Sequence, residues 1–161
     1  MIRLMLPLLL AGCAAGGDTP SLTPITVAAA PVIEDGLPLR ALATQPLPAQ
    51  GCAMFLWTVA PGRKLVSMAR TDNGSIRVAL AGGEVDLARQ AQSGPSLAGF
   101  SERSRFADAA TTIDWALRIE QRADVLDGAV VSEGTLSYTP AVGDSVAVPV
   151  TGIIGCRPAA Q

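Results

Sequence analysis

The chain has 161 residues, a formal net charge of −2 and no histidine, a length that suits one ordinary domain. Its 12 Lys and Arg residues are dispersed among 14 Asp and Glu residues, so no basic face for nucleic acid is expected. The lack of histidine excludes histidine-dependent catalytic triads, histidine metal ligands and the commonest general base at neutral pH.

The first twelve residues have the organisation of an export signal. Arg3 supplies a positive charge, residues 4–10 form an apolar run, and Ala11 and Gly12 are small residues directly before Cys13. The run is shorter than the roughly 20 apolar residues that a membrane-spanning helix needs. We therefore expect residues 1–12 to be a signal peptide that is removed.

The four residues Leu10-Ala11-Gly12-Cys13 resemble the lipobox of bacterial lipoproteins. This resemblance implies cleavage between Gly12 and Cys13, a diacylglyceryl group on the Cys13 sulfur and a further acyl chain, such as palmitate, on its new amino group. Two or three acyl chains, at about 0.8 kcal/mol per buried CH₂, hold a protein durably at a membrane. The alternative is an ordinary secretory signal that happens to precede a cysteine.

The residue after the cysteine bears on which membrane is used. Many proteobacterial lipoproteins that stay at the inner membrane carry Asp there, whereas this chain carries Ala14. The resemblance thus implies a lipid-anchored protein of the cell envelope, at the outer rather than the inner membrane, with its domain facing the periplasm.

Residues 13–50 are predicted to form the lipidated N-terminus and a disordered, proline-rich tether. They show no hydrophobic periodicity, and their prolines remove backbone donors and interrupt helices and central strands. The prolines are Pro20, Pro24, Pro31, Pro38, Pro46 and Pro48. Residues 25–27 are left open as an edge strand of the domain.

The folded domain is expected at residues 51–157, followed by a tail at 158–161. Cys52 and Cys156 bracket the patterned sequence, and an exported protein meets an oxidising compartment, so we predict a disulfide between them. The rival interpretation is a redox-active or metal-binding pair. The sequence has no Cys-x-x-Cys motif and no histidine, so we expect neither a metal nor a cofactor beside the lipid.

An alternating pattern predicts strands throughout this domain. In residues 111–119, Ile113, Trp115 and Leu117 share one face with Ile119. Residues 75–81 and 84–88 flank Gly82-Gly83 and indicate a hairpin. Further strands are expected at residues 53–59, 64–70, 129–131, 135–139 and 145–151.

These segments indicate an all-β fold, a small antiparallel sandwich or barrel of about seven strands closed by one disulfide. Residues 103–110 are expected to form one or two helical turns or a loop. Trp57 and Trp115 are both predicted to pack in the core rather than to form a ligand platform.

No catalytic motif emerges from the sequence. It has no Gly-x-Ser-x-Gly elbow, phosphate-binding Gly-Lys loop or dinucleotide-binding glycine pattern. Asp86, Asp114 and Glu120 are expected at solvent-facing strand positions, where a charge serves solvation. We therefore predict a protein that is not an enzyme.

The plan of a small lipid-anchored β domain with a disulfide resembles the membrane-bound inhibitors of C-type lysozyme. Those inhibitors insert a Ser-Gly loop, followed by a basic residue and Tyr, into the lysozyme active site. The corresponding residues here are Ser93 and Gly94, followed by Pro95 and Ser96, so only Ser93 and Gly94 carry over. The other interpretation of this segment is a Gly-Pro surface loop.

The sequence as a whole favours a non-enzymatic cell-envelope lipoprotein. Its β domain is expected to bind a protein or glycan partner or to support an envelope assembly, without nucleic acid or metal. The alternatives are a protein like the lysozyme inhibitors and a carboxylate-dependent enzyme.

Overall fold

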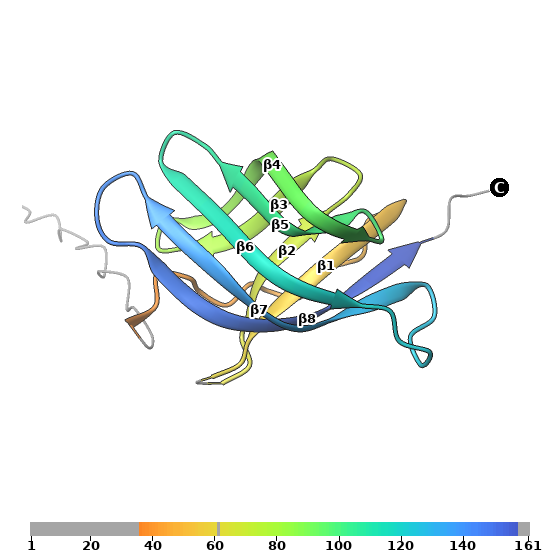
Figure 1. Ribbon diagram of the computed structural model, residues 1–161. Coiled ribbons are helices and arrows are strands. Elements are labelled where there is room, and N and C mark those ends of the chain that lie inside the picture. The colour runs from red at the N-terminus through yellow and green to blue at the C-terminus, as the bar shows by residue number, and fades with distance from the viewer. Residues whose placement is uncertain (1–35, 61, 158–161) are drawn as a thin grey trace, which may run out of the picture. The chain divides into compact units, whose positions relative to one another are not determined.

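The computed structural model describes residues 36–60 and 62–157, which form an antiparallel β-barrel (Figure 1). The predictions for Gly12, Cys13, residues 25–27 and the tail at 158–161 lie outside the described residues. The strands of the barrel are β1 (Gly51–Thr58), β2 (Leu65–Arg70), β3 (Ser75–Leu80), β4 (Gly83–Leu97), β5 (Phe100–Ala107), β6 (Thr111–Glu120), β7 (Gly128–Pro140) and β8 (Val146–Arg157). Within the described residues, no helix is long and apolar enough to cross a membrane.

Each strand pairs with the next along the chain, and β1 pairs with β8, so the sheet closes on itself. The all-β prediction is confirmed, and the choice between sandwich and barrel is settled as a barrel of eight strands. Two-residue turns join β3 to β4 and β4 to β5, because Leu80 pairs with Gly83 and Leu97 pairs with Phe100. The predicted hairpin is present, but its turn residues are Ala81 and Gly82, since Gly83 already belongs to β4. Ala98 and Gly99, between Leu97 and Phe100, both have positive φ, as a type I′ hairpin turn requires.

The inward faces of the strands fill the barrel. Ile113, Trp115 and Leu117 of β6 are buried as predicted, and the Trp115 ring lies 4.7 Å from that of Phe106 between centroids. The Trp115 indole Nε1–H donates a hydrogen bond to the Ser101 carbonyl oxygen at 3.0 Å. Its one polar group is thereby satisfied inside the apolar core.

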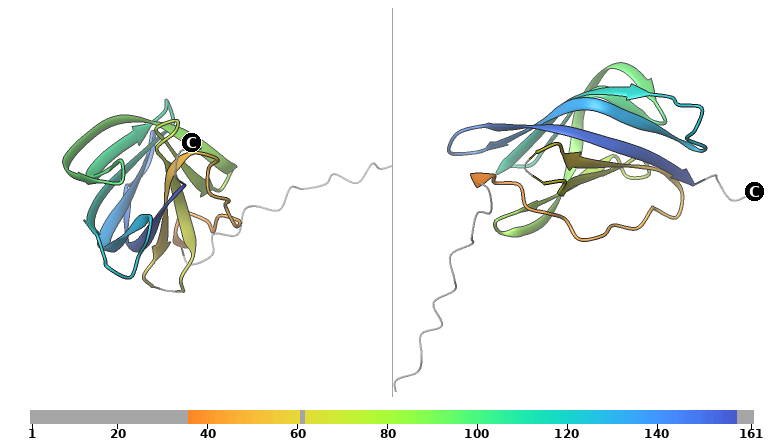
Figure 2. Two further views of the ribbon diagram at one scale, coloured as in Figure 1. Left: turned by 90° about the vertical axis from the view of Figure 1, so that its right-hand side faces the viewer. Right: turned by 90° about the horizontal axis from the view of Figure 1, so that it is seen from below.

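Residues 36–50, here called the strap, lie along the outside of the barrel (Figure 2). The backbone N–H of Leu42 donates to the Leu65 carbonyl at 2.8 Å, and Arg40 forms an isolated bridge with Ala79. The Leu42 side chain is buried over Met68 and Ala79, whereas Leu39 belongs to the main core. The disordered tether was predicted to extend to residue 50, whereas the strap packs on the barrel. The prolines of the strap limit backbone pairing, but its leucines still bury apolar surface.

Residues 103–110 differ from the prediction of a short helix or loop. Residues up to Ala107 belong to β5, which pairs with β4 and β6. Serine at the inward position 104 hides the apolar alternation that Phe100 and Phe106 would otherwise show. The two short strands expected at 129–131 and 135–139 are one strand, β7, with an irregularity between Val131 and Gly134.

Candidate functional site

A groove of about 640 Å³ lies on the outer face of the barrel, over β1, β6, β7 and β8. We call it the Trp57 groove. The connection between β1 and β2 contributes Arg63, and the connection between β6 and β7 contributes Arg122. The remaining lining side chains come from the strands between these connections and include Trp57, Glu120, Val130, Ser132, Thr151 and Ile153.

Trp57 reaches the outer face because β1 alternates. Met54 and Leu56 are fully buried in the core, so Phe55 and Trp57 lie on the other face. The Phe55 and Trp57 ring centroids are 6.2 Å apart, with the planes tilted by 33°. Trp57 is half-buried, which corrects the prediction that it packs in the core. The predicted burial is confirmed only for Trp115.

The strands around this groove are irregular. The β1–β2 register shifts between Leu56 and Trp57, the β6–β7 register between Arg118 and Ile119, and the β7–β8 register between Val131 and Gly134. Such bulges bend strands and increase their local twist, and they often occur beside binding sites. Ile153 of β8 is 43% exposed on the floor of the hollow.

The charged groups of the groove mostly pair locally. Arg122 Nε lies 3.0 Å from Asp124 Oδ1, and Arg118 Nε lies 2.7 Å from Glu120 Oε1. The hydrogen bond from Arg122 holds the pKa of the Asp124 carboxyl below its usual value. Arg63 is exposed and makes no ion pair with any other residue of 36–60 or 62–157. The groove thus offers an aromatic surface and an apolar floor beside one free guanidinium.

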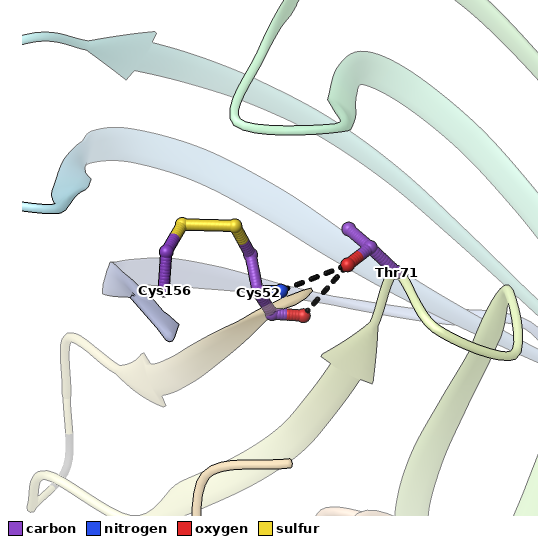
Figure 3. Close-up of a disulfide and its surroundings, with 3 residues drawn as sticks. All are labelled: Cys52, Thr71 and Cys156. Carbon is purple, nitrogen blue, oxygen red and sulfur yellow. Dashed lines mark hydrogen bonds between the residues drawn. A yellow bond between two sulfur atoms is a disulfide. The ribbon is translucent and has the colours of Figure 1, made fainter. Parts of the chain in front are cut away.

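The predicted disulfide between Cys52 and Cys156 is confirmed, and it links β1 to β8 (Figure 3). The two cysteines are directly opposite each other in the strand pairing. Thr71 fixes this end of β1 from the other side: its Oγ1 accepts a hydrogen bond from Cys52 N–H at 2.9 Å and donates one to Cys52 O at 3.2 Å. The bridge therefore joins the two ends of the chain segment that forms the barrel.

Ser93 and Gly94 lie within β4, not in a connecting loop, and Ser93 pairs with Arg103 of β5. Ser93 borders a separate hollow of about 390 Å³, to which Arg103 and the buried Ser104 also contribute. The Ser104 hydroxyl makes no hydrogen bond with the described residues. Neither Ser93 nor Gly94, the two residues that match the loop of the lysozyme inhibitors, borders the Trp57 groove.

The three carboxylates considered for catalysis each pair with an arginine. Asp86 Oδ2 lies 2.7 Å from Arg77 Nη2, and Asp114 Oδ1 lies 2.8 Å from Arg105 Nε; Glu120 pairs with Arg118 as described above. The hydrogen bond from Arg77 lowers the pKa of the Asp86 carboxyl. The part of the chain that the structure describes contains no group of three or more His, Cys, Asp or Glu residues that could hold a metal ion.

Comparisons with protein-family models, with curated proteins and with solved structures found no match. The function therefore has to be argued from the barrel and its grooves. The Trp57 groove is the feature that sequence reasoning missed. Residues 53–57 are apolar on both strand faces. This is the one signal in the sequence that the outer face of β1 also contacts other groups.

Proposed function

We propose that the protein is a non-enzymatic lipoprotein of the cell envelope whose barrel binds a glycan or protein partner through the Trp57 groove. The observation that carries this proposal is a tryptophan, half-buried, in a hollow of about 640 Å³. Tryptophan combines a large apolar surface with a hydrogen-bond donor, and concave sites with aromatic walls and a few polar groups are the usual form of ligand sites.

The ionisation of the carboxylates supports binding over catalysis. A general acid at neutral pH needs a carboxyl whose pKa is raised by burial or by a second carboxylate. Asp86 instead has a lowered pKa beside Arg77. Asp114 and Glu120 also lie against arginines on the outer face of β6, an arrangement that favours charge pairing and solvation.

The binding test uses the unlipidated Cys13→Ser chain, alone or combined with Trp57→Ala or Arg63→Ala. It measures how much of each protein sediments with detergent-insoluble envelope material, from which the membrane lipid has been removed. Removing a central aromatic anchor commonly costs at least about 2 kcal/mol, or about 30-fold in affinity. Arg103→Ala is the matched control, since Arg103 lies on β5, which is four strands away from β1 in the closed barrel. Equal binding by the Trp57→Ala variant would contradict the proposed site.

The lipid anchor is proposed at Cys13, with cleavage after Gly12 and residence at the outer membrane. Cys13→Ser is expected to abolish incorporation of labelled palmitate and to release the protein from membrane fractions, because acylation would be its means of attachment. Ala14→Ser is a suitable control and should stay membrane-bound. Membrane retention of an unlabelled Cys13→Ser protein would overturn this assignment.

A further inference from the structure

Trp57 borders a second hollow, which lies between the strap and the barrel. This hollow has a volume of about 370 Å³ and is lined by Leu42, Thr44, Gln45, Phe55, Trp57 and Leu65. We call it the strap hollow. Trp57 is common to its lining and to that of the Trp57 groove, so one ligand that lies across the indole can reach both.

Among the described residues, those that line the strap hollow carry no charge. Gln45 is held in place, because its Oε1 accepts a hydrogen bond from Arg77 Nη1 at 3.3 Å and its Nε2 donates one to the Ala43 carbonyl at 3.2 Å. Thr44 is exposed beside it and offers a hydroxyl. Moving an ionic group into such a hollow would cost solvation without a compensating partner, which favours an uncharged part of a ligand in the strap hollow.

A peptide is a poorer match to this surface than a polymer without amide backbone. Extended peptides commonly bind by adding a strand to an exposed sheet edge. β1 pairs with both β2 and β8, so the closed barrel offers no free strand edge at Trp57. A ligand must therefore bind through faces and side chains, as sugar rings do with their apolar C–H faces and hydroxyl edges.

We infer that the ligand is a linear oligosaccharide that lies across Trp57, with some of its sugar units in the Trp57 groove and others, which are uncharged, in the strap hollow. This inference rests on the proposed function and names its ligand class. The Phe55 and Trp57 rings provide the apolar surface, while Thr44, Gln45 and Arg63 provide hydrogen-bonding groups along its edges.

The test titrates the full chain in detergent with glucose oligomers and N-acetylglucosamine oligomers of one to six units. Tryptophan fluorescence is the signal, because the chain has two tryptophans and Trp115 is buried. We expect the six-unit oligomer of at least one series to bind at least about tenfold more tightly than the two-unit oligomer, as an extra contact of about 1.4 kcal/mol would give.

Two double variants test whether the gain in affinity with chain length comes from the strap hollow. Thr44→Ala/Gln45→Ala should remove most of the gain in affinity from the two-unit to the six-unit oligomer. Gln92→Ala/Ser93→Ala, on β4, is the matched control and should keep the full gain. Trp57→Ala should lose the binding of oligomers of every length; calorimetry measures this variant, because it lacks the tryptophan that reports binding by fluorescence. Thermal melts of every variant confirm that it is folded.

The outcomes distinguish this inference from the proposed function. If neither oligomer series binds while envelope fractions still bind in a Trp57-dependent way, the inferred ligand class is wrong, but the Trp57 groove remains the proposed binding site. Affinity independent of chain length, or displacement of the oligomer by a peptide of residues 14–35, would also overturn the inference. Binding that survives Trp57→Ala would overturn both.

Discussion

Gly152 of β8 lets β1 and β8 approach each other at the floor of the Trp57 groove. A Cβ at this position would lie 2.3 Å from the Phe55 carbonyl oxygen and 2.7 Å from Leu56 Cδ2. The first of these atoms belongs to the backbone and cannot turn away as the end of a side chain can. Absence of a side chain at Gly152 is therefore a condition for the close pairing of β8 with β1 at Leu56.

We predict that Gly152→Ala lowers the free energy of unfolding by about 1–3 kcal/mol, the usual cost of overpacking. Urea denaturation followed by circular dichroism measures this loss. Gly82→Ala is the matched control, because a Cβ at Gly82 would meet no atom within 4 Å. Equal stability of the two variants would show that β1 and β8 can separate without cost.

The two tryptophans show how far residue patterns reach. Trp115 alternates with Asp114 and Ala116 on a strand with one polar face, so its inward direction could be predicted. In β1, residues on both faces are apolar, because the strap covers part of the outer face. Local alternation could not tell which face of β1 is inside, and the binding groove was missed for that reason.

At the scale of elements, prediction depended on what occupies the inward positions. The hairpin at Gly82-Gly83 and strand β6 carry apolar residues there and were predicted. β5 carries Ser104 inward, and the strap has no periodic pattern, because it packs through separated leucines instead of a continuous face. The strap therefore resembled a tether in sequence while contributing to two apolar clusters.

The strap is predicted to be part of the folded unit. Leu39→Ala should lower the free energy of unfolding by about 2–5 kcal/mol, as for other large-to-small core changes, because Leu39 is 3% exposed. Leu126→Ala is the control, since Leu126 is 88% exposed and its loss should matter little. Thermal melts of the full chain measure both.

A chain that starts at Gly51 tests the same point by another route. It would expose the apolar cluster formed by Ala53, Met68 and Ala79 beneath Leu42, and it should melt at a lower temperature than a chain that starts at Gly36. If the two chains melt together, the strap contributes nothing to stability and the folded unit begins at Gly51, as the sequence suggested.

At the scale of the whole molecule, closure of the barrel is a long-range property. The pairing of β1 with β8 joins segments about 100 residues apart, with Cys52 and Cys156 separated by 104 positions. Strand patterns and turn residues are local, so they indicated antiparallel strands without deciding between a sandwich and a barrel. The cysteines were the one long-range signal in the sequence, and the disulfide they predicted lies at the β1–β8 pairing that closes the barrel.

The disulfide should therefore stabilise the closed barrel as a whole. Disulfides typically contribute about 2–4 kcal/mol, and the chain-entropy model gives about 4–5 kcal/mol for a loop of about this length. The Cys52→Ala/Cys156→Ala variant should therefore melt well below the oxidised wild type. Added reductant should lower the melting temperature of the wild type toward that of the variant and leave the variant itself unchanged.

The site of this loss can be located by hydrogen exchange. Without the disulfide, amides of β1 and β8 should exchange faster, because opening begins where the first and last strands meet. Amides that are hydrogen-bonded between β6 and β7 should exchange faster only through global unfolding. Uniform acceleration in all strands would mean that the barrel opens only as a single cooperative unit. An unchanged melting temperature after reduction would show that the strand pairing and the contacts of Thr71 with Cys52 hold β1 in place without the bridge.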